Sequence, residues 1–263
     1  MKFQSLLIGA LFILNFKNMM ASKIKEEEIT YMSEGVTCKG FVAYDENIKG
    51  KRPAVLVVPE WWGCNDYTRR RARELAELGY IAMAVDMYGE GKVADNPDKA
   101  KESAMPFYQN PEMGNKRILA AEEKIKTYPQ CDANKVAAIG YCFGGSMVLN
   151  SAKSGSDFKG VVSFHGGLAG VPAKSGVLKS KILVCHGGAD KFVSAEDVSK
   201  FKSNLDEVKA YYIFKEYPGA THAFSNPDAD ANAKKFGMPI AYNAKADKES
   251  WEEMKKFLKR IFS

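Results

Sequence analysis

Short apolar runs alternate with segments of helical spacing along this chain, and no other feature constrains its fold as strongly. The run Ala54–Val58 is continuous and apolar, which is typical of a strand buried on both faces of a parallel sheet. Residues 67–78 follow it with alanines and leucines at helical intervals among Arg and Glu, and they end at Gly79. Strands and helices in alternation predict an α/β fold with a doubly wound, mostly parallel sheet.

The alternation continues to the C-terminus without a linker or an internal repeat. Loose alternation with two glycines in residues 29–44 predicts an antiparallel hairpin before the parallel strands. The polar stretch 89–113 contains three prolines and predicts an excursion over the strand ends. We therefore expect one domain over residues 22–263. Further strands are predicted at residues 80–85, 135–139, 160–164, 181–185 and 211–214, and further helices at residues 114–127, 144–153, 195–208 and 247–262.

The first 21 residues have the layout of a secretory signal peptide. Lys2 is followed by the nearly uninterrupted apolar residues 5–16, and the small residue Ala21 marks a weak cleavage site. An apolar run of 12 residues is too short to cross a bilayer of about 30 Å as a helix. We predict a secreted or periplasmic protein without a membrane span. The alternative is an ordinary N-terminal helix on a cytoplasmic protein.

Charge and cysteine usage exclude several classes of protein. The net charge of +6 is spread over mixed acidic and basic residues, whereas nucleic-acid binders gather their cations on one face or tail. Neither a CxxC pair nor a Cys/His cluster of zinc spacing occurs, so we expect no metal site and no nucleic-acid partner. The odd number of cysteines leaves at least one thiol free, and disulfides among the others stay open. The cysteines are Cys38, Cys64, Cys131, Cys142 and Cys185.

The strongest local signal is the sequence Gly140-Tyr141-Cys142-Phe143-Gly144-Gly145, which lies between an apolar strand and an apolar helix. This context is that of a nucleophile elbow, in which glycines permit a sharp turn that leaves no room for side chains. The turn lifts the central residue, Cys142, above the sheet at a helix N-terminus, where the partial positive charge stabilises a thiolate. The alternative is a glycine-rich turn with an inert cysteine.

A nucleophile elbow requires an acid and then a histidine later in the chain. Asp190 follows a predicted strand and is the candidate acid, and His222 is the only histidine after it. Chain order therefore predicts Cys142, Asp190 and His222 as nucleophile, acid and base. His165 and His186 stand at strand ends and are interpreted as hydrogen-bonded structural histidines. A place in the substrate pocket is the alternative for His165.

Glu60 ends an apolar strand and is followed by Trp61 and Trp62. These neighbours would partly desolvate its carboxylate and raise its pKa toward neutrality, although a surface loop glutamate is the alternative. In an elbow fold, the loop after this strand supplies one backbone N–H of the oxyanion hole, and the residue after the nucleophile supplies the other. We therefore assign the oxyanion hole to the N–H groups of Trp61 and Phe143.

Five short motifs in this order resemble those of the dienelactone hydrolase family, from about residue 29 to the C-terminus. The resemblance implies an α/β-hydrolase fold with a Cys-His-Asp triad of Cys142, His222 and Asp190, and a glutamate, Glu60, that contacts the resting thiol. It further implies cleavage of a lactone or ester through a thioester acyl-enzyme, without a cofactor. The motifs are Pro59–Gly63, Asp86–Tyr88, Gly140–Gly145, Gly188–Asp190 and Gly219–Phe224.

The chain departs from the best-known members of that family where two arginines hold the substrate carboxylate. The corresponding positions are Glu90 and Asn226, and the residues after them offer no arginine. Trp62, Tyr88 and His165 are expected to line a pocket of aromatic character instead. We therefore predict a small-molecule substrate, with neutral short-chain or aromatic esters and lactones preferred over anionic ones.

Other functions remain compatible with the same residues. A thioester or small-amide hydrolase could use the same Cys142, Asp190 and His222. A non-catalytic binding or redox-sensing protein with a reactive cysteine is less consistent with them, because a sensor needs no orienting acid. A cation such as Lys92 or Arg69 could also take the place of the missing arginines. The sequence leaves the natural substrate and the oligomeric state open.

Overall fold

A single mixed sheet runs through the computed structural model, which describes residues 22–263. The predicted signal peptide, residues 1–21, lies outside the described residues. The strands are β1 (Ile24–Ser33), β2 (Val36–Asp45), β3 (Arg52–Val58), β4 (Ile81–Ala84), β5 (Cys131–Tyr141), β6 (Gly160–Phe164), β7 (Lys181–Gly187) and β8 (Tyr212–Tyr217). Their order across the sheet is β1-β2-β4-β3-β5-β6-β7-β8. The β1–β2 pair is the predicted antiparallel hairpin, β2 is antiparallel to β4, and the remaining neighbours are parallel.

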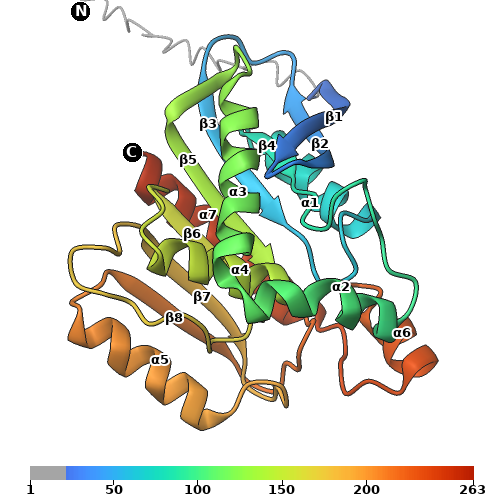
Figure 1. The fold of residues 1–263 in the computed structure, drawn as a ribbon, viewed down its shortest axis with the longest axis vertical. Helices are drawn as coiled ribbons and strands as arrows, with labels where there is room; N and C mark the ends of the chain where they lie inside the picture. Colours follow the sequence, from blue (N-terminus) through green and yellow to red (C-terminus); the bar gives the residue numbers. More distant parts are fainter. Residues whose placement is uncertain (1–21) are drawn as a thin grey trace, which may run out of the picture.

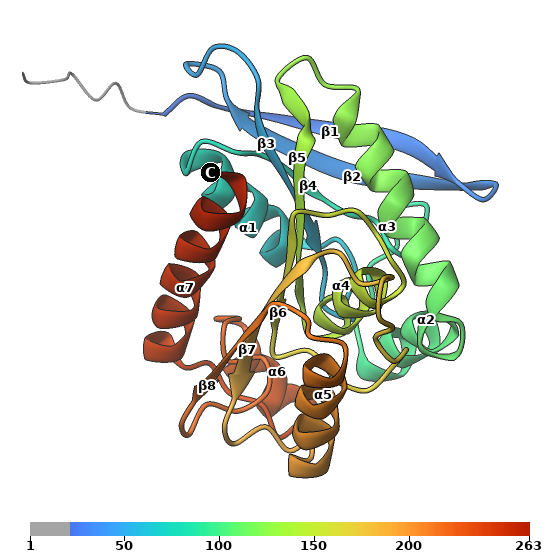
Figure 2. The same ribbon diagram turned by 90° about the vertical axis from the view of Figure 1, so that its left-hand side faces the viewer.

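Helices cover both faces of this sheet, as the doubly wound pattern predicts. Figure 2 shows α1 and α7 on one side of the strands and α3, α4 and α5 on the other. The excursion after β4 carries α2, and the segment after β8 carries α6. The helices are α1 (Asp66–Glu77), α2 (Pro97–Gln109), α3 (Pro111–Lys126), α4 (Phe143–Lys153), α5 (Ala195–Glu207), α6 (Ala229–Phe236) and α7 (Ala244–Phe262).

The central strand β3 accounts for this layering, because its residues alternate between the two faces. Leu56 and Val58 pack in the core under α3 and α4, whereas Val55 and Val57 pack in the core under α1 and α7. Each of these side chains is fully buried. A strand covered on both faces must be apolar throughout, which is why a continuous apolar run predicted it.

The strand order reverses at β3, which has β4 on one side and β5 on the other. In open α/β sheets, ligands bind outside the carboxyl ends of the strands at such a switch point. The carboxyl ends of β3 and β5 point toward α2 and α6 in Figure 1. Glu60 follows β3 and Cys142 follows β5, so both stand at the switch point.

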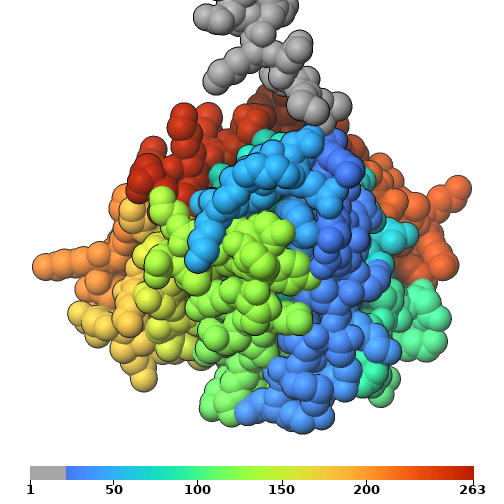
Figure 3. All heavy atoms as spheres, turned by 90° about the horizontal axis from the view of Figure 1, so that it is seen from above, coloured from blue at the N-terminus to red at the C-terminus, as the bar shows by residue number. Residues whose placement is uncertain are grey.

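The opposite end of the sheet is closed by two connections. Figure 3 looks onto this end, where the residues that join β2 to β3 lie against those that join α3 to β5. The N–H of Arg52 donates to the carbonyl of Gln130 across this contact, at 2.8 Å. The pairing fixes the starting points of β3 and β5 side by side, and therefore the relative positions of their carboxyl ends.

Two helices near the switch point differ from the prediction, which placed only an excursion at residues 89–113 and no element at 229–236. Helix α2 begins at Pro97, where the missing N–H costs nothing, and the side chain of Asn96 caps it. Pro106 lies inside α2 and Pro111 opens α3, so these prolines shape helices rather than exclude them. Within residues 22–263 we find no helix that is long and apolar enough to cross a membrane.

Candidate active site

The turn between β5 and α4 holds Cys142 in a conformation with positive φ, which is uncommon for a residue other than glycine, with φ 52° and ψ −114°. The glycines around it have no room for side chains: a Cβ on Gly140 would lie 2.1 Å from the carbonyl oxygen of Gly144. A Cβ on Gly144 would lie 2.3 Å from the carbonyl oxygen of Val58. The sharp turn predicted from the glycine spacing is therefore present. It leaves Cys142 half-buried at the N-terminus of α4, while the other four cysteines are buried and also unpaired.

Three side chains from separate loops come together at this turn. The Sγ of Cys142 lies 3.0 Å from Nε2 of His222, which the segment after β8 carries. The Nδ1 of His222 lies 2.8 Å from Oδ2 of Asp190, which follows β7. The other carboxylate oxygen of Asp190 accepts the N–H of Phe192 at 2.8 Å, and this bond fixes the plane of the carboxylate. The order along the chain and in space is the one predicted from the sequence.

The charge on His222 follows from its two partners. Burial lowers the pKa of His222, but the sulfur of Cys142 and the carboxylate of Asp190 outweigh it and raise this pKa to about 10. In its charged form the imidazole donates Nδ1–H to Asp190 and Nε2–H to the sulfur. Because this pKa lies above 7, the imidazole of His222 is charged at neutral pH and directs Nε2–H at the sulfur.

Glu60 is buried at 3% exposure on the other side of the switch point. Its Oε2 accepts the side-chain N–H of Asn226 at 2.7 Å, and its Oε1 has no partner within the described residues. Burial raises the pKa of Glu60 to about 7, against the opposing effect of the Asn226 hydrogen bond. The expectation of a contact between this glutamate and the resting thiol is not met, because Cys142 points to His222 and Glu60 pairs with Asn226.

Trp61 and Phe143, whose N–H groups are predicted to form the oxyanion hole, follow Glu60 and Cys142 at the switch point. Phe143 is the first residue of α4, where N–H groups lack partners within the helix. Trp61 follows Glu60, and its carbonyl accepts the hydroxyl of Tyr88 at 2.8 Å. The ring of Tyr88 packs at 5.8 Å from the ring of Phe143. Tyr88 thus braces the loop that carries the Trp61 N–H.

A cavity of about 580 Å³ opens above Cys142 and His222. Trp62 lines it, as predicted, and stacks on Phe236 with ring centroids 5.9 Å apart. Lys101 of α2 is the one lysine or arginine among the lining residues in the described chain. Most of the surface is apolar and comes from Trp61, Met105, Tyr108, Phe192, Met238 and Ile240.

Several residues predicted near the substrate lie elsewhere. His165 is fully buried beneath Cys142 and hydrogen-bonded, which confirms its interpretation as a structural histidine, and it does not line the cavity. Tyr88 does not line it either, since its hydroxyl is engaged by Trp61. Glu90 forms an exposed ion pair with Lys39, with 3.3 Å between Oε2 and Nζ, and lies off the cavity.

The cations considered as substitutes for the missing arginines are also elsewhere. Arg69 pairs with Glu28 of β1, and neither Arg69 nor Lys92 lines the cavity. No cluster of His, Cys, Asp and Glu suited to a metal ion occurs within residues 22–263. Besides His222, the described residues that line the cavity therefore include one lysine, Lys101, and one buried acid, Glu60.

Two features of the site were not anticipated. Asn226 stands in the sequence where family members have an arginine, and its amide is the hydrogen-bond donor to Glu60. The wall formed by α6 and residues 236–240 was also missed, since it has little apolar periodicity. The spacing of four residues between His222 and Asn226 is the signal that could have placed Asn226 near the site.

The family model for the dienelactone hydrolase family matches residues 38–262 of this chain. A curated relative from Saccharolobus solfataricus, named as a candidate carboxymethylenebutenolidase, is 26% identical over 275 residues, which cover 90% of this chain and 99% of the relative. Among solved structures, the dienelactone hydrolase-like promiscuous phosphotriesterase P91 from metagenomic libraries is 33% identical, with a TM-score of 0.86. The match covers 91% of this chain and 99% of P91.

A second solved structure supports the fold alone. A candidate dienelactone hydrolase from Klebsiella pneumoniae has a TM-score of 0.75 and 23% identity, over 90% of this chain and 98% of that one. Together with P91 it confirms the predicted α/β-hydrolase fold. The order of elements, the sheet and the turn at Cys142 agree with this assignment.

Proposed function

The chain belongs to the dienelactone hydrolase family and is a hydrolase that acts on esters or lactones, and from this premise we propose that it works through a thioester on Cys142. One observation carries the proposal. The Sγ of Cys142 lies 3.0 Å from His222, which lies 2.8 Å from Asp190, at the floor of an apolar cavity. Nucleophile, base and orienting acid are thus within hydrogen-bond reach of one another.

In the acylation step, the thiolate of Cys142 attacks the carbonyl carbon of the substrate, and the S–C bond forms as the π electrons move to oxygen. The N–H groups of Trp61 and Phe143 stabilise the resulting oxyanion. When the carbonyl re-forms, the C–O bond to the leaving group breaks. The alkoxide takes the Nε2 proton of His222 and leaves as an alcohol, or stays tethered if the substrate is a lactone.

In the deacylation step, His222 is neutral and accepts a proton from water as the water oxygen attacks the thioester carbon. The second tetrahedral intermediate expels the thiolate of Cys142 and releases the acid. The proton on Nε2 restores the imidazolium that faces the sulfur, and Asp190 holds Nδ1–H throughout. No cofactor enters either step.

Glu60 acts through its charge in this proposal. Because its pKa is about 7, it is uncharged in a large fraction of molecules at neutral pH. An uncharged Glu60 leaves the thiolate of Cys142 undisturbed, whereas an ionised Glu60 adds a second anion to the same enclosed region and disfavours the thiolate. Glu60 therefore gates the thiol electrostatically, without the contact that the family resemblance implies.

The lining of the cavity supports neutral substrates. Asn226 is engaged by Glu60, Glu90 is engaged by Lys39, and Lys101 is the single lining lysine or arginine among the described residues. A carboxylate deep in the cavity would have no lysine or arginine as a partner and would lie near the carboxyl of Glu60. Short-chain or aromatic esters and lactones without charge fit this environment.

A second candidate activity is hydrolysis of neutral phosphotriesters. The cavity of about 580 Å³ is broad and largely apolar, and P91, at 33% identity, is named a promiscuous phosphotriesterase. A phosphotriester is uncharged and its oxygen develops negative charge on attack, so the N–H groups of Trp61 and Phe143 could serve it as well. The thioester of the first proposal would then be replaced by a phosphoryl thiolate on Cys142.

The test is hydrolysis of a neutral aryl ester combined with intact-mass measurement after an acid quench. We expect turnover and one acyl group on Cys142 in the natural protein. Cys142→Ala should lose both while its melting temperature stays within a few degrees, since the side chain lies at the edge of the cavity. Cys142→Ser should be severely impaired, because its hydroxyl is not ionised near neutral pH. Substantial hydrolysis by Cys142→Ala would reject the proposal.

The same assay separates the rival functions. A panel of matched ester, thioester, amide and phosphotriester substrates with one chromogenic leaving group ranks the reaction classes by kcat/KM. A protein that reacts with iodoacetamide at Cys142 but turns over no member of the panel would be a reactive-cysteine binding or redox protein instead. A phosphotriester that inactivates the protein in a 1:1 ratio would indicate that it phosphorylates Cys142 and that the phosphoryl thiolate is not hydrolysed.

A further inference from the structure

Beneath Cys142, on the side away from the cavity, a chain of hydrogen bonds ends at its backbone N–H. This N–H donates to Nδ1 of His165 at 3.1 Å and to the carbonyl of Phe164 at 3.0 Å. His165 has no exposed surface and adopts a positive φ of 41°, which is uncommon for a residue other than glycine. A conformation of this kind persists where the surrounding structure fixes it.

The donors and acceptors define one tautomer of His165. Because Nδ1 accepts a hydrogen bond from a backbone N–H, the ring proton must be on Nε2, which donates to Oγ of Ser225 at 2.8 Å. Burial lowers the pKa of His165 well below its ordinary value, so the ring is neutral. A charged ring would direct a second N–H at the N–H of Cys142.

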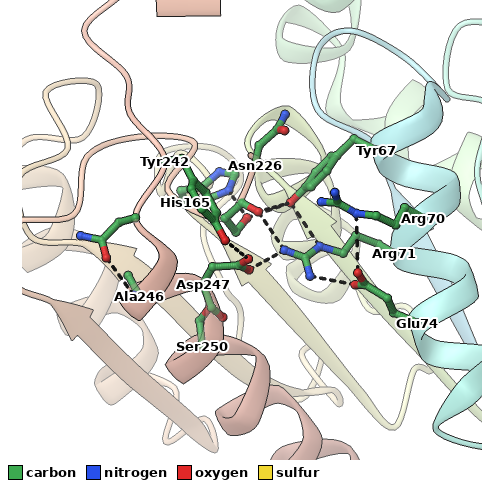
Figure 4. A network of polar contacts seen from close by, with 12 residues as sticks. Tyr67, Arg70, Arg71, Glu74, His165, Asn226, Tyr242, Ala246, Asp247 and Ser250 are labelled. Atoms are coloured by element: carbon green, nitrogen blue, oxygen red, sulfur yellow. Dashed lines mark hydrogen bonds and ion pairs between the residues drawn. The ribbon is translucent and has the colours of Figure 1, made fainter. Parts of the chain in front are cut away.

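The chain continues from Ser225 to helix α1. Oγ of Ser225 lies 2.8 Å from the hydroxyl of Tyr67, which also donates to the carbonyl of Ser225 at 3.3 Å. Arg71, one turn along the helix, donates Nη2–H to the same carbonyl at 2.8 Å. Figure 4 shows the guanidinium of Arg71 held between Glu74 and Asp247. Every polar group from Arg71 to His165 is therefore paired.

We propose that His165 is a positioning residue, held in one neutral tautomer by Ser225, Tyr67 and Arg71 so that it fixes the backbone of the nucleophile. The next N–H along the chain, on Phe143, belongs to the proposed oxyanion hole. A turn that is free to relax at Cys142 would therefore misdirect both the sulfur and this N–H. The proposal rests on the proposed role of Cys142 and adds the residues that hold it in place.

The pair His165→Asn and His165→Gln tests the proposal, because the two amides replace different ring nitrogens. The amide of Asn reaches the position of Nδ1, can accept the N–H of Cys142, and tolerates a positive φ. The amide of Gln reaches toward Nε2 and leaves the N–H of Cys142 without this acceptor. We expect kcat of His165→Gln to fall by about 30-fold with KM within about twofold of the natural value. His165→Asn should retain at least about tenfold more kcat than His165→Gln.

Two tyrosine variants provide a matched control for the outer part of the chain. Tyr67→Phe removes the hydroxyl that is hydrogen-bonded to Ser225. Tyr242→Phe removes a hydroxyl that donates to Asp247 at 3.2 Å, on the far side of Arg71. We expect kcat to fall by about 5-fold in Tyr67→Phe and by less than about twofold in Tyr242→Phe. Melting temperatures of all variants show whether any variant is partly unfolded at the assay temperature. Partial unfolding would lower the apparent kcat of either tyrosine variant in proportion to the unfolded fraction.

The outcomes distinguish this proposal from the proposed function. If hydrolysis by the natural protein survives complete alkylation of Cys142 by iodoacetamide, the nucleophile assignment fails whatever His165 does. If alkylation abolishes hydrolysis but His165→Gln and His165→Asn have equal kcat, the positioning role of His165 is rejected. A rise in KM without a fall in kcat would likewise reject it, because it would indicate a substrate contact instead.

Discussion

His222 and His165 lie on opposite sides of Cys142 with their rings 5.4 Å apart, yet their environments favour opposite protonation states. His165 is fully buried and His222 is largely buried, and burial alone would keep both neutral. A carboxylate and a sulfur contact His222 and raise its pKa to about 10, whereas a backbone N–H and a serine hydroxyl contact His165. The partners, rather than the depth of burial, decide which ring carries charge.

The two protonation states place a mobile proton, on His222, on the cavity side of Cys142 and a fixed proton, on His165, beneath it. A mobile proton on the cavity side can be exchanged with substrate and water, as the proposed chemistry requires. A fixed proton on the underside cannot move without breaking the pairing of Ser225 and Tyr67. The experiments below alter one side at a time, and they are ordered from the largest expected effect to the smallest.

Removal of the mobile proton should have the largest effect. We expect His222→Asn to lower kcat/KM by about 10³-fold or more, because neither thiolate formation nor leaving-group protonation is then assisted. Alkylation of Cys142 by iodoacetamide at pH 6.5 should slow in the same variant. His165→Asn, with the ring lost on the other side, is the matched control and should alkylate at close to the natural rate. Equal slowing in both variants would contradict the division between the two histidines.

Asp190→Asn should weaken the charged side without removing it. The amide can no longer accept Nδ1–H as an anion, so the favoured tautomer of His222 and its positive charge are both lost in part. We expect kcat to fall by about 10²- to 10³-fold while KM changes little. Near-normal turnover by this variant would move the acid role to another residue, and Asp206 or Asp228 would be the first to examine.

The pKa of His222 itself offers a test that needs no substrate. Burial lowers this pKa, and Cys142 and Asp190 together raise it to about 10. In Cys142→Ala one of the two raising effects is absent, so the pKa should fall, and His222 should lose its proton at lower pH than in the natural protein. Titration of the ring protons by nuclear magnetic resonance measures this shift. An unchanged pKa would mean that Asp190 alone sets the charge.

Glu60→Gln should change the pH dependence of stability. The pKa of Glu60 is raised from 4.5 to about 7, so its contribution is fully present below pH 4.5 and is lost as pH rises through 7. Gln does not titrate, so the variant loses no stability in this range. Its free energy of unfolding, minus that of the natural protein, should therefore be about 2–3 kcal/mol larger at pH 8 than at pH 5. Urea unfolding at both pH values measures it. Glu90→Gln, at an exposed carboxyl, controls for the simple loss of charge.

Substrate charge should have the smallest effect. We expect kcat/KM for a neutral ester to exceed that for its carboxylated analogue by about tenfold at fixed ionic strength, the equivalent of one weak charged contact. Lys101→Met should widen the ratio, because Lys101 is the lysine or arginine that lines the cavity in the described chain. A ratio below one would overturn the substrate proposal and leave the assignment of Cys142 intact.

The sequence predicted those parts of the molecule whose structure follows from a local pattern, such as a continuous apolar run or a set of closely spaced glycines. Val55, Leu56 and Val57 belong to a continuous apolar run, which is typical of a strand covered on both faces, and the glycines around Cys142 are typical of a tight turn. The order of Cys142, Asp190 and His222 then left one arrangement, and the structure brings them together. These predictions depended on local pattern and chain order alone.

The residues that the sequence misplaced are those whose role depends on a distant partner. Asn226 can donate to many groups, and nothing within its own segment indicates that Glu60, 166 positions earlier, accepts its N–H. For His165 the sequence left both a structural role and a place in the pocket open, and the turn after β6, which directs its ring beneath Cys142, decides for the structural role. Polar pairing across the sheet is a tertiary property, and neither periodicity nor spacing carries it.

One segment, between β8 and α7, supplies both His222 and part of the cavity wall. A backbone bridge joins His222 to Ile240, and Met238 and Ile240 face the cavity. A substrate too large for the cavity would displace this wall, and because Ile240 is bridged to His222, it would also move the imidazole away from the sulfur. Oversized esters should therefore behave as inhibitors that occupy the protein without being consumed. Variants of this enzyme with broader tolerance would need a wall that moves independently of the histidine.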